Sequence, residues 1–272
     1  MIAHVRSAAN PRLKRLRSLR EKKYRRAHGL FLAEGLRIVT EAVDAGWEPQ
    51  ALVFATGRED HPLVRRLVHA TLDTGGEVLA VPPALLTGLT GKDNPQVVVG
   101  AFAPRILPLS GLRPAPILLA AERLRDPGNL GTLLRSCDGA GAAALILLGD
   151  CTDPFSVEAV RASMGAIFTV PIVEAGVADL VGWKRAHGAT LTGAALDPAA
   201  IDYRRADYGG PAILVLGNEA EGLPAEMKAA CDQLVAIPMH GRADSLNVAM
   251  AGTLLLYEAR RAAGGDIPTS RS

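Results

Sequence analysis

The chain has 272 residues, 49% of them hydrophobic, and its formal net charge at pH 7 is only +2. This length can bury one large core or two modest ones, and we favour two domains. A net charge so close to zero excludes any argument for a nucleic-acid partner from overall charge, so the distribution of charge along the chain matters more.

Residues 1–102 are predicted to form a small α/β domain. Residues 10–26 are expected to form one basic helix, and the remainder alternates helical and strand patterns. The predicted helices lie near residues 35–45 and 61–73, and the predicted strands at 51–54, near 77–80 and near 96–101.

The stretch "APRILPLSGLRPAP", residues 103–116, is predicted to be a linker, because proline fits neither a helix interior nor a sheet ladder. From residue 117 to 272, short apolar runs alternate with helical patterns, which indicates a mostly parallel sheet with helices on both faces. Strands are expected at 117–121, 144–148, 168–173, 189–196, 212–217 and 234–238, and helices at 129–140, 156–166, 177–187 and 224–230, followed by a last helix after residue 245.

Three loops after predicted strands carry more glycine and polar side chains than a simple connection needs. In parallel sheets, ligands bind beyond the carboxyl ends of the strands. In the first loop, residues 122–142, Asn129 is the expected helix cap. Arg135 lies off the buried face of that helix, and its guanidinium can lean back toward the loop. A capped helix with a solvated Arg135 is the equally favoured alternative.

The second loop, "LVLGNEAEGLP" at residues 214–224, is acidic and rich in glycine. It lacks the Lys-Ser/Thr ending of a phosphate-binding loop, and its two acids, Glu219 and Glu221, would repel phosphate. It therefore suits a neutral or cationic ligand. A simple strand-to-helix turn with exposed acids remains the alternative.

The third loop precedes the last helix and includes "HGRADSLN", residues 240–247. Asp244 or Ser245 is the expected N-cap of the helix, whereas Asn247 inside the first turn gains little there. His240 has no cysteine or carboxylate spaced to share a metal ion with it. Together the three loops are stronger evidence for a site than any one of them.

A nucleotide-dependent oxidoreductase is one alternative, because "GAGAAA" at residues 139–144 has the form of a dinucleotide-binding motif. The motif must follow a strand and open a helix, whereas here it follows a helix and precedes a strand. This context disfavours the alternative.

The cysteines and the apolar runs indicate where the protein works. Cys137, Cys151 and Cys231 are widely spaced, with the pattern of neither a metal site nor a disulfide framework. No apolar run approaches the roughly 20 residues of a membrane-spanning helix, and no signal peptide is seen. We expect a cytoplasmic protein without structural metal or a membrane partner.

The three loops, in this order, resemble the three motifs of the SpoU/TrmH family of RNA 2′-O-ribose methyltransferases, within the SPOUT superfamily. The matching segments are "NLGTLLR" (129–135), "LVLGNEAEGL" (214–223) and "IPMHGRADSLNVAMA" (237–251). The first hundred residues are similar to the family's optional substrate-binding domain, related to ribosomal protein L30e, through "NPRLKRL" and "FLAEGLRIV".

This resemblance implies an α/β protein in which an L30e-like domain precedes a SPOUT catalytic domain with a C-terminal trefoil knot. It implies methyl transfer from S-adenosylmethionine to a ribose 2′-hydroxyl, and a homodimer whose active sites are completed across the interface. The appended domain favours ribosomal RNA over transfer RNA as the substrate. The implied catalytic group is Asn129, Arg135, Glu219, Ser245 and Asn247. The implied cofactor-binding residues are Leu216, Gly217, Asn218, Gly222, Ile237, Met239, Ser245, Leu246 and Asn247.

Residues 6–26 carry ten basic side chains against one acidic side chain, which fits an RNA-binding arm. We expect this arm to bind the phosphate backbone rather than to stack on bases. A solvated helix face is the alternative, and a non-catalytic RNA-binding protein of the same fold is the rival function. The expected RNA-binding residues are Arg12, Lys14, Arg15, Arg17, Lys22, Lys23 and Arg25.

Overall fold

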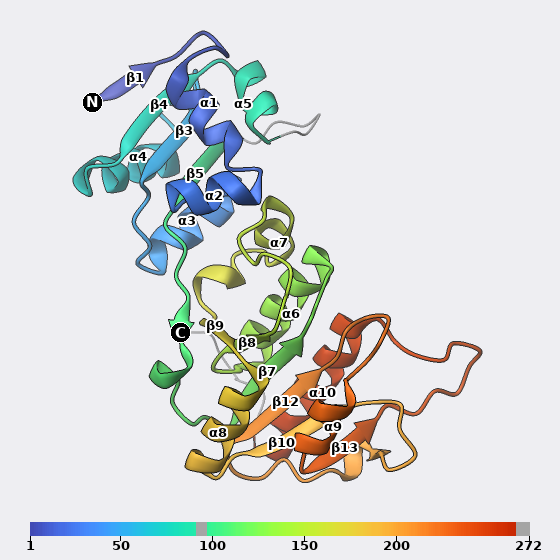
Figure 1. Ribbon diagram of the computed structural model, residues 1–272. Coiled ribbons are helices and arrows are strands. Elements are labelled where there is room, and N and C mark those ends of the chain that lie inside the picture. Colours follow the sequence, from blue (N-terminus) through green and yellow to red (C-terminus); the bar gives the residue numbers. More distant parts are fainter. Residues whose placement is uncertain (91–96, 265–272) are drawn as a thin grey trace. The chain divides into compact units, whose positions relative to one another are not determined.

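The computed structural model describes residues 1–90 and 97–264 and divides into two compact units (Figure 1). The first unit contains Met1–Arg105 and Asp153–Thr169, and the second contains Ile106–Thr152 and Val170–Ser272. The first unit therefore takes in a segment that the sequence alone assigns to the catalytic domain.

The first unit is built on a five-stranded sheet with the order β1-β4-β3-β5-β2. Strands β1, β4 and β3 are parallel, whereas β5 runs antiparallel to both of its neighbours. Leucines of α1 and α5 pack on one face of the sheet, and α3 and α4 cover the other. The strands are β1 (Ile2–His4), β2 (Phe31–Glu34), β3 (Ala51–Ala55), β4 (Glu77–Val81) and β5 (Val98–Phe102). The helices are α1 (Pro11–Ser18), α2 (Lys22–His28), α3 (Leu36–Asp44), α4 (Pro62–Asp73), α5 (Pro83–Thr90), α7 (Val157–Ala162) and the 3₁₀ turn η2 (Ala166–Phe168).

The prediction of one basic helix over residues 10–26 is wrong, because the chain breaks between α1 and α2. Leu13, Leu16 and Leu19 are fully buried, but residues 20–26 contain no aliphatic side chain that could extend this buried face. The chain turns after Leu19 instead. The predicted strand near 96–101 is observed as β5, and its first residue lies outside the described residues. The short strands β1 and β2 have only three and four residues, too few to show a clear periodicity.

Segment Asp153–Thr169 packs into the first unit through aromatic rings and one ion pair. The Phe31 and Phe155 ring centroids are 4.7 Å apart, and Trp47 Nε1 donates to the Phe168 carbonyl at 2.9 Å. Asp153 Oδ2 accepts from Arg25 Nη2 at 2.6 Å. Because Phe168 belongs to this cluster, the strand predicted at 168–173 begins only at Ile172.

The second unit has an eight-stranded sheet, β11-β13-β10-β12-β7-β8-β9-β6, in which every pair is parallel. Its strands are β6 (Leu107–Pro108), β7 (Ile117–Glu122), β8 (Leu145–Leu148), β9 (Ile172–Ala175), β10 (Thr190–Ala194), β11 (Ile201–Asp202), β12 (Ala212–Leu216) and β13 (Gln233–Ala236). Its helices are α6 (Pro127–Ala140), α8 (Val177–His187), α9 (Ala225–Ala230) and α10 (Val248–Ala262), with 3₁₀ turns η1 (Leu109–Gly111) and η3 (Tyr203–Arg205). Part of the predicted linker thus forms β6 and η1. The prediction of an α/β fold with a parallel sheet is confirmed.

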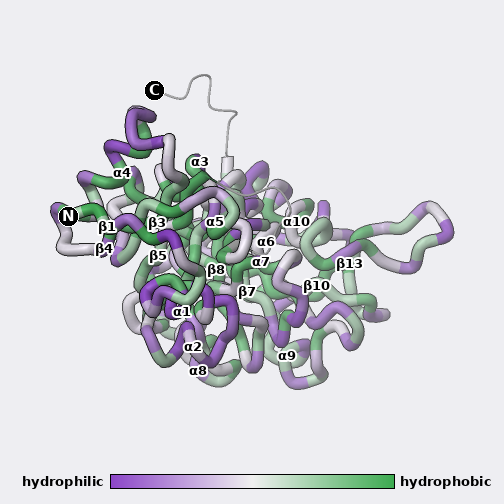
Figure 2. The backbone as a smooth tube through the Cα atoms, turned by 90° about the horizontal axis from the view of Figure 1, so that it is seen from above, coloured by the Kyte–Doolittle hydropathy of each residue, from purple (hydrophilic) through white to green (hydrophobic). Residues whose placement is uncertain are grey.

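Helices cover both faces of this sheet, whose central strands are apolar (Figure 2). Helices α8 and α9 pack on one face, and α6 and α10 pack together on the other. Gly252 permits that packing, since a Cβ there would lie 2.6 Å from Leu133 and 2.7 Å from Leu216. Within residues 1–90 and 97–264, no helix has the length and apolar character needed to cross a membrane.

Breaking the Arg25–Asp153 ion pair should destabilise the first unit. Arg25→Ala leaves the Asp153 carboxylate, whose side chain is only 16% exposed, without its partner. We expect a loss of about 3 kcal/mol in the free energy of unfolding, at the lower end of the range for buried ion pairs. Urea unfolding can be followed by the fluorescence of Trp47 alone in a Trp183→Phe background. Arg26→Ala, at an exposed neighbour in the same helix, is the control and should change the free energy of unfolding by less than ~0.5 kcal/mol. Equal effects of the two substitutions would contradict this role of the ion pair.

Candidate active site

The three polar loops meet at one edge of the second unit's sheet. Strands β7 and β12 are neighbours, and β10 lies between β12 and β13. Because all of these strands are parallel, their carboxyl ends lie at the same edge. The segments that follow β7, β12 and β13 are residues 123–126, 217–224 and 237–247.

Asn218 joins the second loop to the first. Arg123 leaves β7 with φ of 49°, in the left-handed region that residues other than glycine rarely adopt. Its carbonyl accepts a hydrogen bond from Asn218 Nδ2 at 2.8 Å, and its guanidinium pairs with Glu221 at 3.1 Å. The Asn218 Oδ1 also accepts from the backbone N–H of Ala220 at 2.9 Å. One amide side chain therefore holds the turn of its own loop and the strained exit from β7.

Glu219 is the main acceptor between these two loops. Its carboxylate accepts from the backbone N–H groups of Arg125 at 3.3 Å and Asp126 at 3.1 Å, and from Asn129 Nδ2 at 3.2 Å. Burial raises the pKa of Glu219, but the hydrogen bonds it accepts outweigh burial and bring its pKa below the ordinary value of 4.5. The carboxylate is thus ionised at neutral pH.

Asn129 and Asn247 connect the first and third loops. Asn247 Nδ2 donates to Asn129 Oδ1 at 2.9 Å, while Asn247 Oδ1 caps α10 by accepting from Ala249 N at 2.9 Å. The three motifs are therefore linked in one chain of hydrogen bonds, Glu219–Asn129–Asn247.

Both predicted helix caps are wrong by a few residues. Asp126, not Asn129, caps α6 and accepts from Asn129 N at 2.6 Å. Asn247, not Asp244 or Ser245, caps α10. Asp, Asn and Ser are nearly equivalent as caps, so residue type cannot choose among close neighbours. The side-chain oxygen Oδ1 of Asn247 thus caps α10. Its side-chain nitrogen Nδ2 remains available to donate to Asn129.

A cavity of about 520 Å³ lies beside this hydrogen-bonded chain. Its lining combines apolar residues, such as Leu255, with the acidic residues Glu219, Glu221 and Asp244. A Cβ at Gly217 would lie 2.2 Å from the Gly222 carbonyl carbon, so the loop can close on itself only with glycine there. All nine expected cofactor-binding residues line the cavity: Leu216, Gly217, Asn218, Gly222, Ile237, Met239, Ser245, Leu246 and Asn247.

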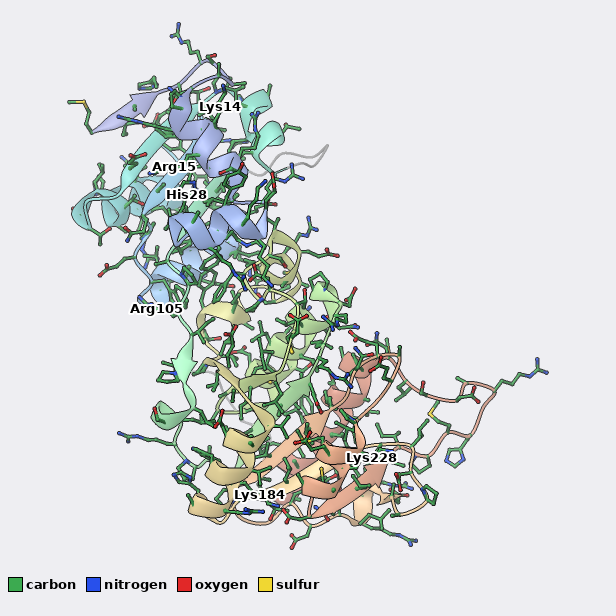
Figure 3. All side chains as sticks on the ribbon, viewed as in Figure 1. Lys14, Arg15, His28, Arg105, Lys184 and Lys228 are labelled. Atoms are coloured by element: carbon green, nitrogen blue, oxygen red, sulfur yellow. The ribbon has the colours of Figure 1, made fainter. Side chains whose placement is uncertain are left out.

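One wall of the cavity is formed by residues that were not predicted from the sequence. Ala194 ends β10, and Ala195 and Leu196 follow it. Lys228 comes from α9 (Figure 3) and pairs with Asp197 at 2.9 Å. The three apolar residues carry no chemical signal. Their position at the end of a strand adjacent to β12 is the only feature of the sequence that could have indicated them.

The structure brings together four of the five expected catalytic residues. Glu219, Ser245 and Asn247 line the cavity, and Asn129 bonds to two of them. Arg135 is exposed on α6, two turns from its start. Within the described ranges, no hydrogen bond or ion pair ties its guanidinium to the preceding loop.

The expected RNA-binding residues are mostly exposed, and the side chains of Lys14 and Arg15 can be followed on α1 in Figure 3. Arg17 is half-buried. Arg25 requires a correction, since it is buried and its guanidinium bonds to Asp153 and to the carbonyls of Leu19 and Arg20. It is therefore not part of the exposed basic surface. The part of the chain that the structure describes contains no group of three or more His, Cys, Asp or Glu side chains placed to hold a metal ion.

Replacing Glu219 should loosen the first loop. Glu219→Gln removes one acceptor oxygen and the negative charge, so we expect amide hydrogen exchange at Arg125 and Asp126 to become about fivefold faster, equivalent to a net hydrogen bond of ~1 kcal/mol. Glu226→Gln, at an exposed acid of α9, is the control and should leave the exchange rates at Arg125 and Asp126 unchanged. The Glu219 charge contributes its full stabilisation above pH 4.5, and this contribution is lost as the pH falls through the lowered pKa of the folded state. The exchange rates of wild type and Glu219→Gln should therefore converge at that low pH. Indistinguishable exchange at pH 7 would rule out the role of Glu219 in holding the loop.

Two family models match the chain in separate regions. Residues 116–257 match the SpoU rRNA Methylase family, and residues 10–100 match the MRM3-like substrate binding domain. The second region covers the predicted substrate-binding domain, and the first covers all three loops.

Individual proteins give the same result over most of the chain. A 23S rRNA (uridine(2479)-2′-O)-methyltransferase of Streptomyces viridochromogenes is 35% identical, over 86% of this chain and 83% of the relative. The 23S rRNA (guanosine(2553)-2′-O)-methyltransferase RlmP of Bacillus subtilis is 30% identical, over 94% of this chain and 98% of the relative. The crystal structure of an AdoMet-bound rRNA methyltransferase from Sinorhizobium meliloti has a TM-score of 0.90 and 43% identity, covering 96% of this chain and 98% of that one. The resemblance found in the motifs is confirmed, and the chain belongs to the SpoU rRNA methylase family.

Proposed function

We propose that this protein transfers a methyl group from S-adenosylmethionine to a ribose 2′-hydroxyl of ribosomal RNA. The observation that carries the proposal is the cavity at the carboxyl edge of the sheet, which is lined by residues of the second and third family motifs and hydrogen-bonded to the first. Relatives named as 23S rRNA 2′-O-methyltransferases support the reaction and favour ribosomal over transfer RNA.

The cavity fits S-adenosylmethionine in size and in charge. Its volume of about 520 Å³ lies within the range of small-molecule sites. Apolar residues such as Leu216 and Ile237 suit an adenine ring, and Glu219, Glu221 and Asp244 suit a ligand with a positive charge. When bound, the cofactor supplies a methyl group on a cationic sulfonium. The chain would hold it through the nine residues named above.

The remaining chemistry falls to the protein. A ribose 2′-hydroxyl is a very weak acid and hence a poor nucleophile, so it must be held in line with the methyl group as its proton leaves. Arg135 is the side chain we assign to this step. An arginine in a protein stays protonated, so we propose that its guanidinium stabilises the developing alkoxide or an adjacent phosphate rather than removing the proton.

We propose further that the protein is a homodimer. Met250, Leu254 and Tyr257 form an exposed apolar stripe at helical spacing along α10, which supports a docking face for a second copy. Helix α6, which carries Arg135, packs beside α10, with Ser136 and Thr253 hydroxyls 2.7 Å apart. A partner docked there would bring a second Arg135 close to this face. The family also supports a trefoil knot in the C-terminal region and a cytoplasmic location.

Cofactor binding can be tested by titrating S-adenosylhomocysteine into the protein by calorimetry. We expect about one site per subunit. Asn247→Ser keeps a capping oxygen but removes the Nδ2 donor to Asn129, so binding should weaken about fivefold, equivalent to a hydrogen bond of ~1 kcal/mol. Asn10→Ser, the same change at the N-cap of α1, is the matched control and should bind like wild type. Absence of binding by the wild type, also in the presence of bulk RNA, would favour the non-catalytic RNA-binding alternative.

The exposed basic side chains of α1 and α2 can be tested by the salt dependence of RNA binding. Arg12→Glu, Lys14→Glu and Lys22→Glu together should weaken binding and flatten the slope of log K against log salt, because phosphate contacts release counterions. Arg58→Glu with Arg65→Glu provides a control at exposed arginines in and before α4, the helix that covers the opposite face of the sheet. An unchanged slope in the triple variant would show that this segment is only a solvated face.

A further inference from the structure

Helix α2 directs nearly its whole surface to solvent. Arg25 is its only buried residue, and all six others are exposed (the helix is hydrophilic in Figure 2). A helix without an apolar face needs another anchor. The Arg25 guanidinium provides it, with Nη1 bonds of 2.9 and 2.8 Å to the Leu19 and Arg20 carbonyls and the ion pair to Asp153. The exposed side chains are therefore presented on a fixed support.

Two of the exposed side chains are aromatic rings. Tyr24 and His28 lie one helical turn apart, with centroids separated by 6.3 Å and planes inclined by only 14°. Lys23 Nζ lies 4.6 Å from the Tyr24 ring centroid. Neither ring belongs to the buried aromatic cluster around Phe31. Tyr24 is 36% exposed, so part of its side chain remains open to solvent.

We propose that Tyr24 and His28 form a stacking site for an unpaired RNA base. This inference rests on the proposed RNA-methyltransferase function and deepens it, because it assigns to the first unit a preference for single-stranded RNA. It also revises the expectation that residues 6–26 contact only the phosphate backbone, because that expectation overlooked the aromatic ring of Tyr24.

The chemistry around the rings favours a nucleic acid as the ligand. Lys22 and Arg26 are exposed in the same short helix. Lys23 is also exposed and pairs with Glu21, the one acid immediately before the helix, at 3.2 Å. Cations that follow a phosphate backbone, interleaved with rings that stack on bases, are the usual combination in proteins that bind single-stranded RNA. A duplex keeps its bases stacked inside and offers such rings little to bind.

The test compares two RNA probes, an unstructured 12-nucleotide single strand and a 12-base-pair duplex, bound to full-length protein. Tyr24→Ala should weaken binding of the single strand by about 5- to 150-fold, equivalent to about 1–3 kcal/mol for one stacked base. It should change duplex binding less than twofold. Tyr24→Phe keeps the ring and should bind both probes like the wild type.

Salt dependence separates stacking from charge. Tyr24→Ala removes no charge, so the slope of log K against log salt should stay at the wild-type value, whereas Lys22→Gln should flatten it. Single-strand affinity unchanged in Tyr24→Ala, or equal losses on both probes, would overturn the stacking site while leaving the proposed methyltransferase intact. Failure of the wild type to bind either probe would instead contradict RNA binding by this unit, and the stacking site with it.

Discussion

The candidate active site depends on one chain of hydrogen bonds, from Glu219 through Asn129 to Asn247. Asn129 lies in the first turn of α6, directly after the first loop, whereas Glu219 and Asn247 belong to the second and third loops. Asn129 and Asn247 are 118 residues apart in the sequence. Loops at the edge of a sheet are ordinarily its most mobile part. Here the Glu219 carboxylate, whose pKa is lowered, accepts hydrogen bonds from two backbone N–H groups and from the Asn129 side chain. The Asn247 side chain, which bonds to Asn129, also caps α10. Order in the three loops is therefore coupled to the fold of the second unit.

The backbone provides what these side chains need. A parallel sheet brings the ends of β7, β12 and β13 to one edge, and Gly217 lets the second loop fold closely on Gly222. Gly252 lets α10 approach α6 and β12 where any larger residue would collide. The strained φ of Arg123 is held by a hydrogen bond to its carbonyl from Asn218. Packing and polar contacts thus fix the walls of the cavity jointly.

Much of the second unit could be predicted because its strands are continuous apolar runs, such as "LILL" at β8, separated by helical patterns. The order of the three motifs was equally readable. The helix caps were not, because Asp126 and Asn129, or Ser245 and Asn247, are chemically interchangeable at that position. The burial of Arg25 could not be predicted either. Its partner Asp153 is 128 residues away, and only the fold brings the two together.

We propose that the three loops form the site of ribose methylation on ribosomal RNA. The most direct measurement is to incubate the protein with unmethylated 23S rRNA transcript and S-adenosylmethionine carrying a trideuterated methyl group, then to digest the RNA and analyse its nucleosides by mass spectrometry. We expect the label on one 2′-O-methylated nucleoside, at close to one per transcript, and none on a transfer RNA pool. Label on a base, label on transfer RNA in preference, or no transfer despite cofactor binding would contradict this proposal.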